Sequence, residues 1–173
     1  MMFIENQDWK KCVDFHGHEC PGLAIGYQAA LLARELLSVQ FSADEEIVCV
    51  SENDACGVDA IQVLLGCSAG KGNLLFRLRG KQAFNFFCRE SGKSIRLVFK
   101  PQVMSSDVTK AERALSILTA RKESLFEVKK PTFELPHRAR LFKSLPCSMC
   151  GEMTAEPYLN EVNGQLICKD CTH

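Results

Sequence analysis

Two pairs of cysteines near the end of the chain constrain its folding more than any other feature. Each pair has the form Cys-x-x-Cys, seventeen residues separate the pairs, and the four residues are Cys147, Cys150, Cys168 and Cys171. A two-residue gap lets a tight turn direct two thiolates at one ion, and two such turns complete the tetrahedral shell that zinc prefers. Asn163-Gly164 between the pairs is a typical hairpin-turn dipeptide. The pattern predicts a small zinc ribbon over residues 147–173.

A redox-active thiol pair is the alternative for either motif, but one metal ion explains two pairs at this spacing more simply. Four thiolates leave the ion no open coordination position, so its role would be structural. Residues 147–173 carry one basic and four acidic side chains, and four thiolates on one zinc ion add about two negative charges. Because phosphate would be repelled, we expect this module to contact protein, and nucleic acid is not an expected partner.

The whole chain has 173 residues, ten of them cysteine, and equal numbers of basic and acidic side chains, 21 of each. Zero net charge is unlike that of general nucleic-acid or membrane-surface binders. The first residues carry charges where a secretion signal needs an apolar run, and the longest nearly apolar run, 23–33, is too short to cross a bilayer. We therefore expect a cytoplasmic protein without a membrane segment, in which thiols stay reduced and serve metal binding or catalysis.

Charge divides the chain into three parts. Residues 1–120 carry 13 basic and 14 acidic side chains, whereas residues 121–146 carry 7 and 3 and contain three prolines. We expect a core domain over 1–120, a basic connector over 121–146 and the ribbon over 147–173.

The core domain alternates helical and strand patterns. Helices are expected over 4–14, 23–38, 58–65 and 108–118, the last with Ser105 or Ser106 as its N-cap. Strands are expected over 46–52, over 94–100 and on both sides of a turn at Gly80 within 73–88. This order indicates an α+β fold with a mostly antiparallel sheet packed against helices.

The sequence FHGHECPG at 15–22 places His16, His18 and Cys20 at alternate positions. The residue before a proline favours extended backbone, and alternate side chains of an extended chain point the same way. The three side chains are therefore predicted to face one site. Pro21 suits the first turn of the following helix, which would put Cys20 at a helix N-terminus, where the dipole lowers a thiol pKa.

The sequence SENDACG at 51–57 joins a strand to a helix, with Cys56 near the helix start. Two thiols at two helix starts, with histidines nearby, predict a transition-metal or catalytic site formed by His16, His18, Cys20 and Cys56. Cys56 would be a ligand or nucleophile and His18 a ligand or general base, with Asp54 supporting them. The alternative is that the histidines only form hydrogen bonds in a glycine-rich loop and that both cysteines are buried.

The loop GCSAGKG at 66–72 resembles a phosphate loop but lacks its spacing, its hydroxyl residue and its following helix. Nucleotide hydrolysis is therefore not expected. Lys71 is instead expected to contact an anionic substrate. Cys12, Cys49 and Cys88 lie on apolar elements and are expected in the core.

These stretches together resemble the formylmethanofuran dehydrogenase E-subunit family. The matching pieces are FHGHECPGLAIGYQAA at 15–30, ENDACGVDAIQVLLGCSAGKGNL at 52–74, RGKQAFNFF at 79–87 and LPHRARLFKSLPCSMCGE at 135–152. The resemblance implies a homodimeric α+β core, a four-cysteine ribbon in some members, and association with a molybdenum or tungsten enzyme that handles a formyl group on a one-carbon carrier. It also implies a metal-binding active site at His16, His18, Cys20 and Cys56, without supplying a reaction.

Two functions stay open. One is a metalloprotein with zinc in the ribbon and a second transition metal ion in the core, acting with a metal-cofactor enzyme. The other is a non-enzymatic adaptor, whose ribbon and basic connector bind a partner protein and whose His/Cys cluster is purely structural. A regulator that binds DNA or RNA through the ribbon is a third idea, which the charge counts argue against.

Overall fold

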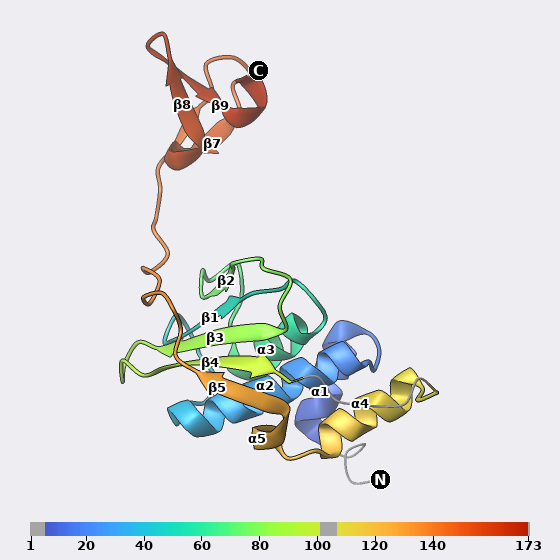
Figure 1. The fold of residues 1–173 in the computed structure, drawn as a ribbon. Helices are drawn as coiled ribbons and strands as arrows, with labels where there is room; N and C mark the ends of the chain where they lie inside the picture. The colour runs from blue at the N-terminus through green and yellow to red at the C-terminus, as the bar shows by residue number, and fades with distance from the viewer. Residues whose placement is uncertain (1–5, 101–106, 173) are drawn as a thin grey trace. The chain divides into compact units, whose positions relative to one another are not determined.

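The computed structural model describes residues 6–100 and 107–172 (Figure 1). The chain divides into two compact units, residues 1–138 and residues 139–173. The larger unit combines helices with a mostly antiparallel sheet, so the predicted α+β fold class is confirmed. Within the described ranges, no helix is both long enough and apolar enough to span a membrane.

Five strands of the larger unit form one sheet. They are β1 (Ile47–Ser51), β2 (Leu74–Phe76), β3 (Ala83–Cys88), β4 (Ser94–Phe99) and β5 (Phe126–Lys129). The spatial order is β2-β1-β3-β4-β5; β2 is parallel to β1, and the other neighbours are antiparallel. The two strands predicted around Gly80 both form, but they do not pair with each other. Cys49 of β1 pairs with Leu74 on one side and with Phe86 on the other, so β1 lies between them.

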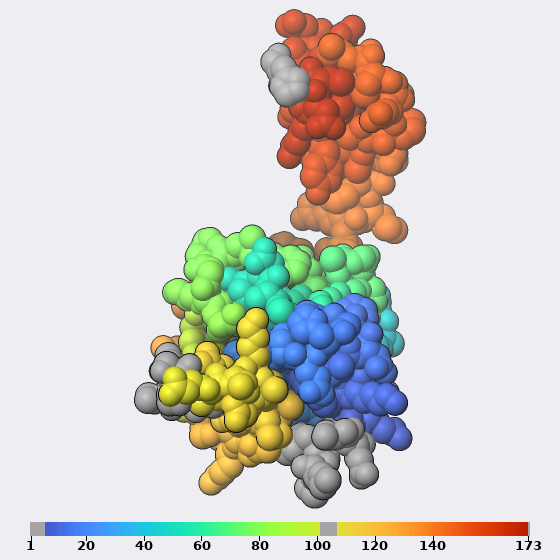
Figure 2. Space-filling model, turned by 90° about the vertical axis from the view of Figure 1, so that its right-hand side faces the viewer, coloured from blue at the N-terminus to red at the C-terminus, as the bar shows by residue number. Residues whose placement is uncertain are grey.

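Helices cover one face of this sheet. They are α1 (Gln7–His16), α2 (Pro21–Leu37), α3 (Gly57–Leu65), α4 (Lys110–Thr119) and the short α5 (Lys122–Leu125). The central helix is α2, which packs against α3, α4 and the sheet strands β3 and β4. In Figure 2, α4 (yellow) lies beside the N-terminal helices (blue), in agreement with the contacts between α2 and α4. Because α2 is enclosed by these neighbours, most of its residues are buried and apolar, as its all-round apolar pattern requires.

Alternation along the strands sorts side chains between the two faces of the sheet. Ile47 and Cys49 of β1 belong to the main core beneath the helices. Val48 and Val50 point to the other face and pack with Phe87 of β3. Phe133, whose ring centroid lies 5.7 Å from that of Phe87, covers part of this second face.

The start of α4 illustrates a local sequence rule. Thr109 is its N-cap: the Thr109 side chain accepts a hydrogen bond from the backbone N–H of Glu112, and the Glu112 side chain accepts one from the backbone N–H of Thr109. This capping box satisfies two N–H groups that the helix itself leaves without partners. The predicted caps, Ser105 and Ser106, lie outside the described residues.

The segment 121–146, which the sequence indicated as a connector, contributes to both units. Its first part forms α5 and β5, the edge strand beside β4, because Leu125 and Phe126 are apolar and complete the core. The rings of Phe126 and Phe99 meet at a centroid distance of 5.8 Å. Its last residues form β6 (Ser144–Pro146) of the smaller unit.

The smaller unit contains two hairpins. Strand β6 pairs with β7 (Met153–Ala155), and β8 (Leu159–Val162) pairs with β9 (Gln165–Cys168). The two 3₁₀ turns are η1 (Glu156–Tyr158) and η2 (Lys169–Cys171). Asn163 and Gly164 form the β8–β9 turn with φ values of 53° and 78°, the left-handed conformation that hairpin turns of this type need. This arrangement fits the small ribbon that the cysteine spacing predicts.

Candidate metal centres

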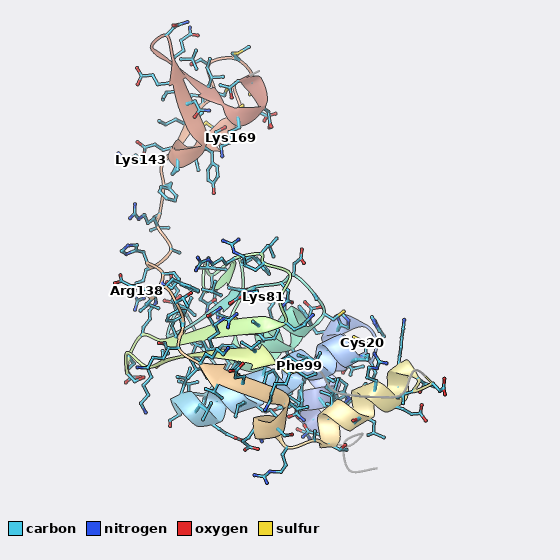
Figure 3. The ribbon with its side chains drawn as sticks, viewed as in Figure 1. Cys20, Lys81, Phe99, Arg138, Lys143 and Lys169 are labelled. Atoms are coloured by element: carbon cyan, nitrogen blue, oxygen red, sulfur yellow. The ribbon has the colours of Figure 1, made fainter. Side chains whose placement is uncertain are left out.

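Two glycines bring the starts of α2 and α3 together. A Cβ atom added at Gly26 would lie 1.9 Å from the carbonyl oxygen of Gly57, so only glycine permits this helix crossing. One turn earlier, a Cβ atom added at Gly22 would lie 3.1 Å from Cβ of Cys56. Since Cys20 is the N-cap of α2 and Cys56 that of α3, the close crossing sets the separation of the two thiols. Figure 3 labels Cys20 at the start of α2.

Three predicted residues form a cluster at this point. Donor atoms of His16, Cys20 and Cys56 all lie within 4.8 Å of one another. Sγ of Cys20 is 3.7 Å from Nε2 of His16, close to the roughly 3.6 Å that separates nitrogen and sulfur ligands around a tetrahedral ion. One imidazole and two thiols suit a transition metal ion, and they leave a fourth tetrahedral position for another ligand.

Asp59 orients the histidine of this cluster. Its Oδ2 lies 2.7 Å from Nδ1 of His16, and its Oδ1 accepts a hydrogen bond from Nε2 of Gln62 at 3.1 Å. A carboxylate on Nδ1 keeps Nε2 free to bind metal, an arrangement typical of metal-ligating histidines. Sequence reasoning missed Asp59. The spacing Cys56-x-x-Asp59 on a helix places both residues on one face and could have indicated it.

The two thiols differ in their surroundings. Sγ of Cys20 accepts a hydrogen bond from the backbone N–H of Leu23 at 3.3 Å, as an N-cap does. Burial and the hydrogen bond with the Cys20 thiol raise the pKa of Cys56. Neighbouring thiols resist ionising together unless a cation offsets the second charge. The pair therefore has the chemistry of a cation site.

An open cavity of about 450 Å³ adjoins the cluster. His16, Cys56 and Asp59 are among its lining residues, together with Leu74 and Phe76 of β2. The cluster is thus partly accessible to a small molecule, in a cavity that both polar and apolar side chains line.

The structure does not bring the other predicted residues into the cluster. The exposed ring of His18 lies beside that of His16, at a centroid distance of 4.5 Å and an interplanar angle of 37°. Asp54 is exposed and lines the cavity without joining the ligand set. Lys71 does not line this cavity: its Nζ donates to the carbonyl of Ser42 at 2.8 Å and lies 5.6 Å from the ring centroid of Phe41. Lysine at this position therefore holds the loop before β1 instead of facing the site.

The four cysteines of the smaller unit form a second cluster, with all four Sγ atoms within 4.8 Å of one another. Sγ of Cys150 is 3.9 Å from Sγ of Cys168, close to the roughly 3.8 Å expected between sulfur ligands of tetrahedral zinc. Sγ of Cys147 accepts backbone hydrogen bonds, first from Cys168 at 3.3 Å and also from Met149 at 3.4 Å. These bonds lower the pKa of Cys147 to about 6. The geometry suits a closed four-thiolate shell.

The remaining cysteines are core residues. Cys12, Cys49, Cys67 and Cys88 are all buried, and desolvation raises the pKa of Cys12 and of Cys67 to about 12. The thiols of Cys12 and Cys67 therefore stay protonated and act as small apolar side chains.

The fold and the two clusters define a class of candidate metal-binding proteins: an α+β unit with a Cys/His cluster at two helix starts, followed by a four-cysteine unit. The family model described as "FmdE, Molybdenum formylmethanofuran dehydrogenase operon" matches residues 15–135, more than half of the chain. The chain therefore belongs to the FmdE family, and the resemblance seen in the sequence is confirmed. The matched range includes the whole His16, Cys20 and Cys56 cluster.

Two known proteins illustrate the relationship. A protein of Archaeoglobus fulgidus named "Probable S-adenosyl-L-methionine-binding protein" is 26% identical in an alignment 170 residues long. The match covers 81% of this chain and 46% of that protein. The chain thus spans about half the length of this relative. The crystal structure of a tungsten formylmethanofuran dehydrogenase E-subunit (FmdE)-like protein from Syntrophus aciditrophicus has a TM-score of 0.70 and 21% identity, and it covers 94% of this chain and 88% of that one. At this identity the likeness shows the fold.

Proposed function

We propose that this FmdE-family member is a metalloprotein whose His16, Cys20 and Cys56 bind a transition metal ion with an open coordination position. The observation that supports it most is the hydrogen bond between Asp59 and Nδ1 of His16, since it leaves Nε2 free beside two thiols. The three ligands are half-buried, and two of them, His16 and Cys56, line a cavity, whereas a purely structural site is usually closed.

A metal ion held there would act as a Lewis acid toward a molecule in its open position. Side chains around the ion would orient its ligands and supply a nucleophile and a general base. Asp59 fixes the ring orientation of His16, and Cys56 lines the cavity as a ligand or, alternatively, a nucleophile. His18 is exposed beside His16 and is the candidate general base, and Asp54 lies at the cavity wall.

The four-cysteine cluster is the proposed site of structural zinc. Its sulfur separations suit zinc in a closed shell, and among the described residues the cluster contains cysteine alone. In the described part of the unit, the hydrophobic cluster has three buried members, two of them proposed ligands: Cys147, Ile167 and Cys168. An ion is therefore expected to supply much of its folding free energy.

The proposal extends to assembly and location. The names of the family and of the Syntrophus protein support association with a molybdenum or tungsten one-carbon enzyme, or with a related redox enzyme. We place the protein in the cytoplasm, where the thiols of both clusters stay reduced and can bind metal. A homodimer belongs to the same proposal, and light scattering of the purified protein tests it.

An adaptor without enzymatic activity is the second candidate. The smaller unit exposes large apolar side chains: Met149 at 64%, Met153 at 66% and Tyr158 at 56%. Methionine and tyrosine are typical of protein-binding surfaces. The adaptor predicts one metal ion per chain, in the four-cysteine cluster, whereas the metalloprotein predicts two.

Cobalt titration of the metal-free protein separates the two candidates. We expect the wild type to bind two Co²⁺ ions with thiolate-to-cobalt absorption, and both Cys56→Ser and Cys147→Ser to bind one. Cys88→Ser, which removes a buried thiol outside both clusters, is the matched control and should bind two. If Cys56→Ser still binds two ions with an unchanged spectrum, the core metal site is refuted.

A further inference from the structure

A small basic pocket lies on the larger unit, outside both metal clusters. Its volume is about 230 Å³, and its lining residues are Glu52, Arg77, Arg79, Lys81, Arg96, Thr132 and Phe133. Figure 3 labels Lys81, in the loop that leads into β3, and Cys20, at the start of α2. Arg77 follows β2 in the chain, whereas Leu74 and Phe76 of β2 line the cavity beside the metal cluster. No residue lines both this pocket and the cavity beside the metal cluster.

The charges of this pocket are unbalanced. Glu52 is the single carboxylate among its lining residues, and it is bound to Arg96: its oxygens accept hydrogen bonds from Nε at 2.6 Å and from Nη2 at 2.9 Å. Among the described residues, Arg77, Arg79 and Lys81 have no carboxylate partner within ion-pair distance. Three positive charges therefore face the pocket without compensation.

The base of the pocket is rigid. Glu52 is 6% exposed and also accepts a hydrogen bond from Nδ2 of Asn85 at 3.0 Å. Two side chains, Asn85 and Arg96, therefore fix the position of the Glu52 carboxylate. Hydrogen bonding to Arg96 lowers the pKa of Glu52 to about 2, and the pair stays charged near neutral pH. Arginine side chains bind oxyanions through pairs of N–H groups, and the exposed Arg77 and Arg79 line the pocket beside this buried pair.

The backbone of the loop is fixed as well. The N–H groups of Arg77 and Arg79 donate to the carbonyls of Ser51 and Glu52, each at 2.8 Å. The carbonyl of Lys81 accepts a hydrogen bond from Nδ2 of Asn53, also at 2.8 Å. The guanidinium of Arg77 lies 4.7 Å from the ring centroid of Phe133, which restricts the arginine while leaving its N–H groups able to donate. Nη1 of Arg79 donates to the carbonyl of Leu78 at 2.9 Å. Two of the three exposed cations thus have contacts that order them before a ligand binds, which lowers the ordering cost of binding.

We propose that this pocket binds the phosphoryl or pyrophosphoryl group of a small anionic ligand. Arginine forks match the oxygens of phosphate in pairs, and three uncompensated cations match the charge of a phosphate ester or pyrophosphate. The volume suits one or two phosphoryl groups and excludes a large rigid ring system within the pocket.

The test is calorimetric titration of the full-length, metal-loaded protein with pyrophosphate and with inorganic phosphate. In Arg77→Ala/Arg79→Ala we expect the pyrophosphate affinity to fall about tenfold or more, and added salt to weaken wild-type binding. Lys110→Ala/Arg113→Ala removes two exposed charges from α4, outside the pocket, and is the matched control. It should keep the wild-type affinity. Thermal melts check that each variant is folded.

Three results would overturn the proposal. The first is no measurable binding of either anion by the wild type at low salt. The second is an equal loss of affinity in the α4 control, which would show a general charge effect. The third is tighter binding of a single-stranded oligonucleotide than of pyrophosphate, lost in the same Arg77/Arg79 variant, which would assign the pocket to nucleic acid. None of these results depends on the core metal site.

Discussion

Gly26→Ala tests whether α2 and α3 cross as closely as the cluster of Cys20 and Cys56 requires. The added Cβ would lie 1.9 Å from the Gly57 carbonyl oxygen and 2.4 Å from its Cα. Both are backbone atoms and cannot rotate away. To reach an ordinary contact of about 3 Å or more, the helices must separate by at least about 1 Å at this point.

Two effects of the substitution oppose each other. Alanine is the better helix former, which alone would stabilise the helix by about 1 kcal/mol. Forcing a methyl group into a closed interface costs about 1–3 kcal/mol, and here the backbone itself must move, so the upper end applies. We therefore expect the free energy of unfolding to fall by about 1–2 kcal/mol. The same shift would move the two thiols apart and weaken metal binding.

The assay is urea unfolding of the metal-free protein, followed by the fluorescence of Trp9. This is the chain's single tryptophan, it is 3% exposed on α1, and it therefore reports the larger unit alone. Gly22→Ala is the matched control, because its added Cβ meets the Cβ of Cys56 at a milder 3.1 Å. It should stay within about 1 kcal/mol of the wild type. If Gly26→Ala is as stable as the wild type, or more stable, the close crossing is wrong.

Other predictions concern the core and the ligand shell. The buried Nδ2 of Asn73 donates to three carbonyls, among them that of Ile47 at 2.9 Å, so Asn73→Ala should cost about 2–3 kcal/mol in urea unfolding; a cost below about 0.5 kcal/mol would contradict this. Arg96 lowers the pKa of Glu52 from 4.5 to about 2. This pair therefore contributes at most about 3 kcal/mol to the free energy of unfolding, and the contribution is complete above pH 4.5 and is lost as pH falls toward 2. Glu52→Gln should lose stability at neutral pH and show a shallower decline over that window, and parallel pH profiles would refute the pairing. Asp59→Asn should lower core-metal affinity about 10–100-fold in chelator competition while the four-cysteine cluster keeps its ion; unchanged core affinity would show that the carboxylate does not support the histidine.

Much of the local structure could be predicted from the sequence. The Cys-x-x-Cys spacing predicts a cluster because short turns impose it, and the structure places all four thiols together. Pro21 predicts the start of α2 with Cys20 as its cap, since proline suits the first helical turn. In the first case the determining residues lie within one short stretch, 147–171, and in the second they are adjacent in the chain.

The features that the sequence did not predict depend on residues far apart in the chain. Lys71 lies within a glycine-rich loop that suggested an anion contact, but the carbonyls it binds belong to Ser42 and Ala43, almost thirty residues earlier. The position of β1 between β2 and β3 depends on which strands pair, and β1 is far from both partners in the chain. His18 and His16 alternate as an extended chain would require, yet α1 continues through His16 and Gly17 ends it in a left-handed conformation. The two rings therefore meet at an angle of 37°, and the alternation rule does not apply.

X-ray absorption spectroscopy of the metal ion in a Cys147→Ser variant tests the central claim most directly, because the core cluster is then the remaining intact site. We predict about one bound ion per chain, with two sulfur ligands near 2.3 Å and one or two nitrogen or oxygen ligands near 2.0–2.1 Å. A chain that retains no ion, or an ion bound by nitrogen and oxygen alone, would contradict a core metal centre formed by His16, Cys20 and Cys56.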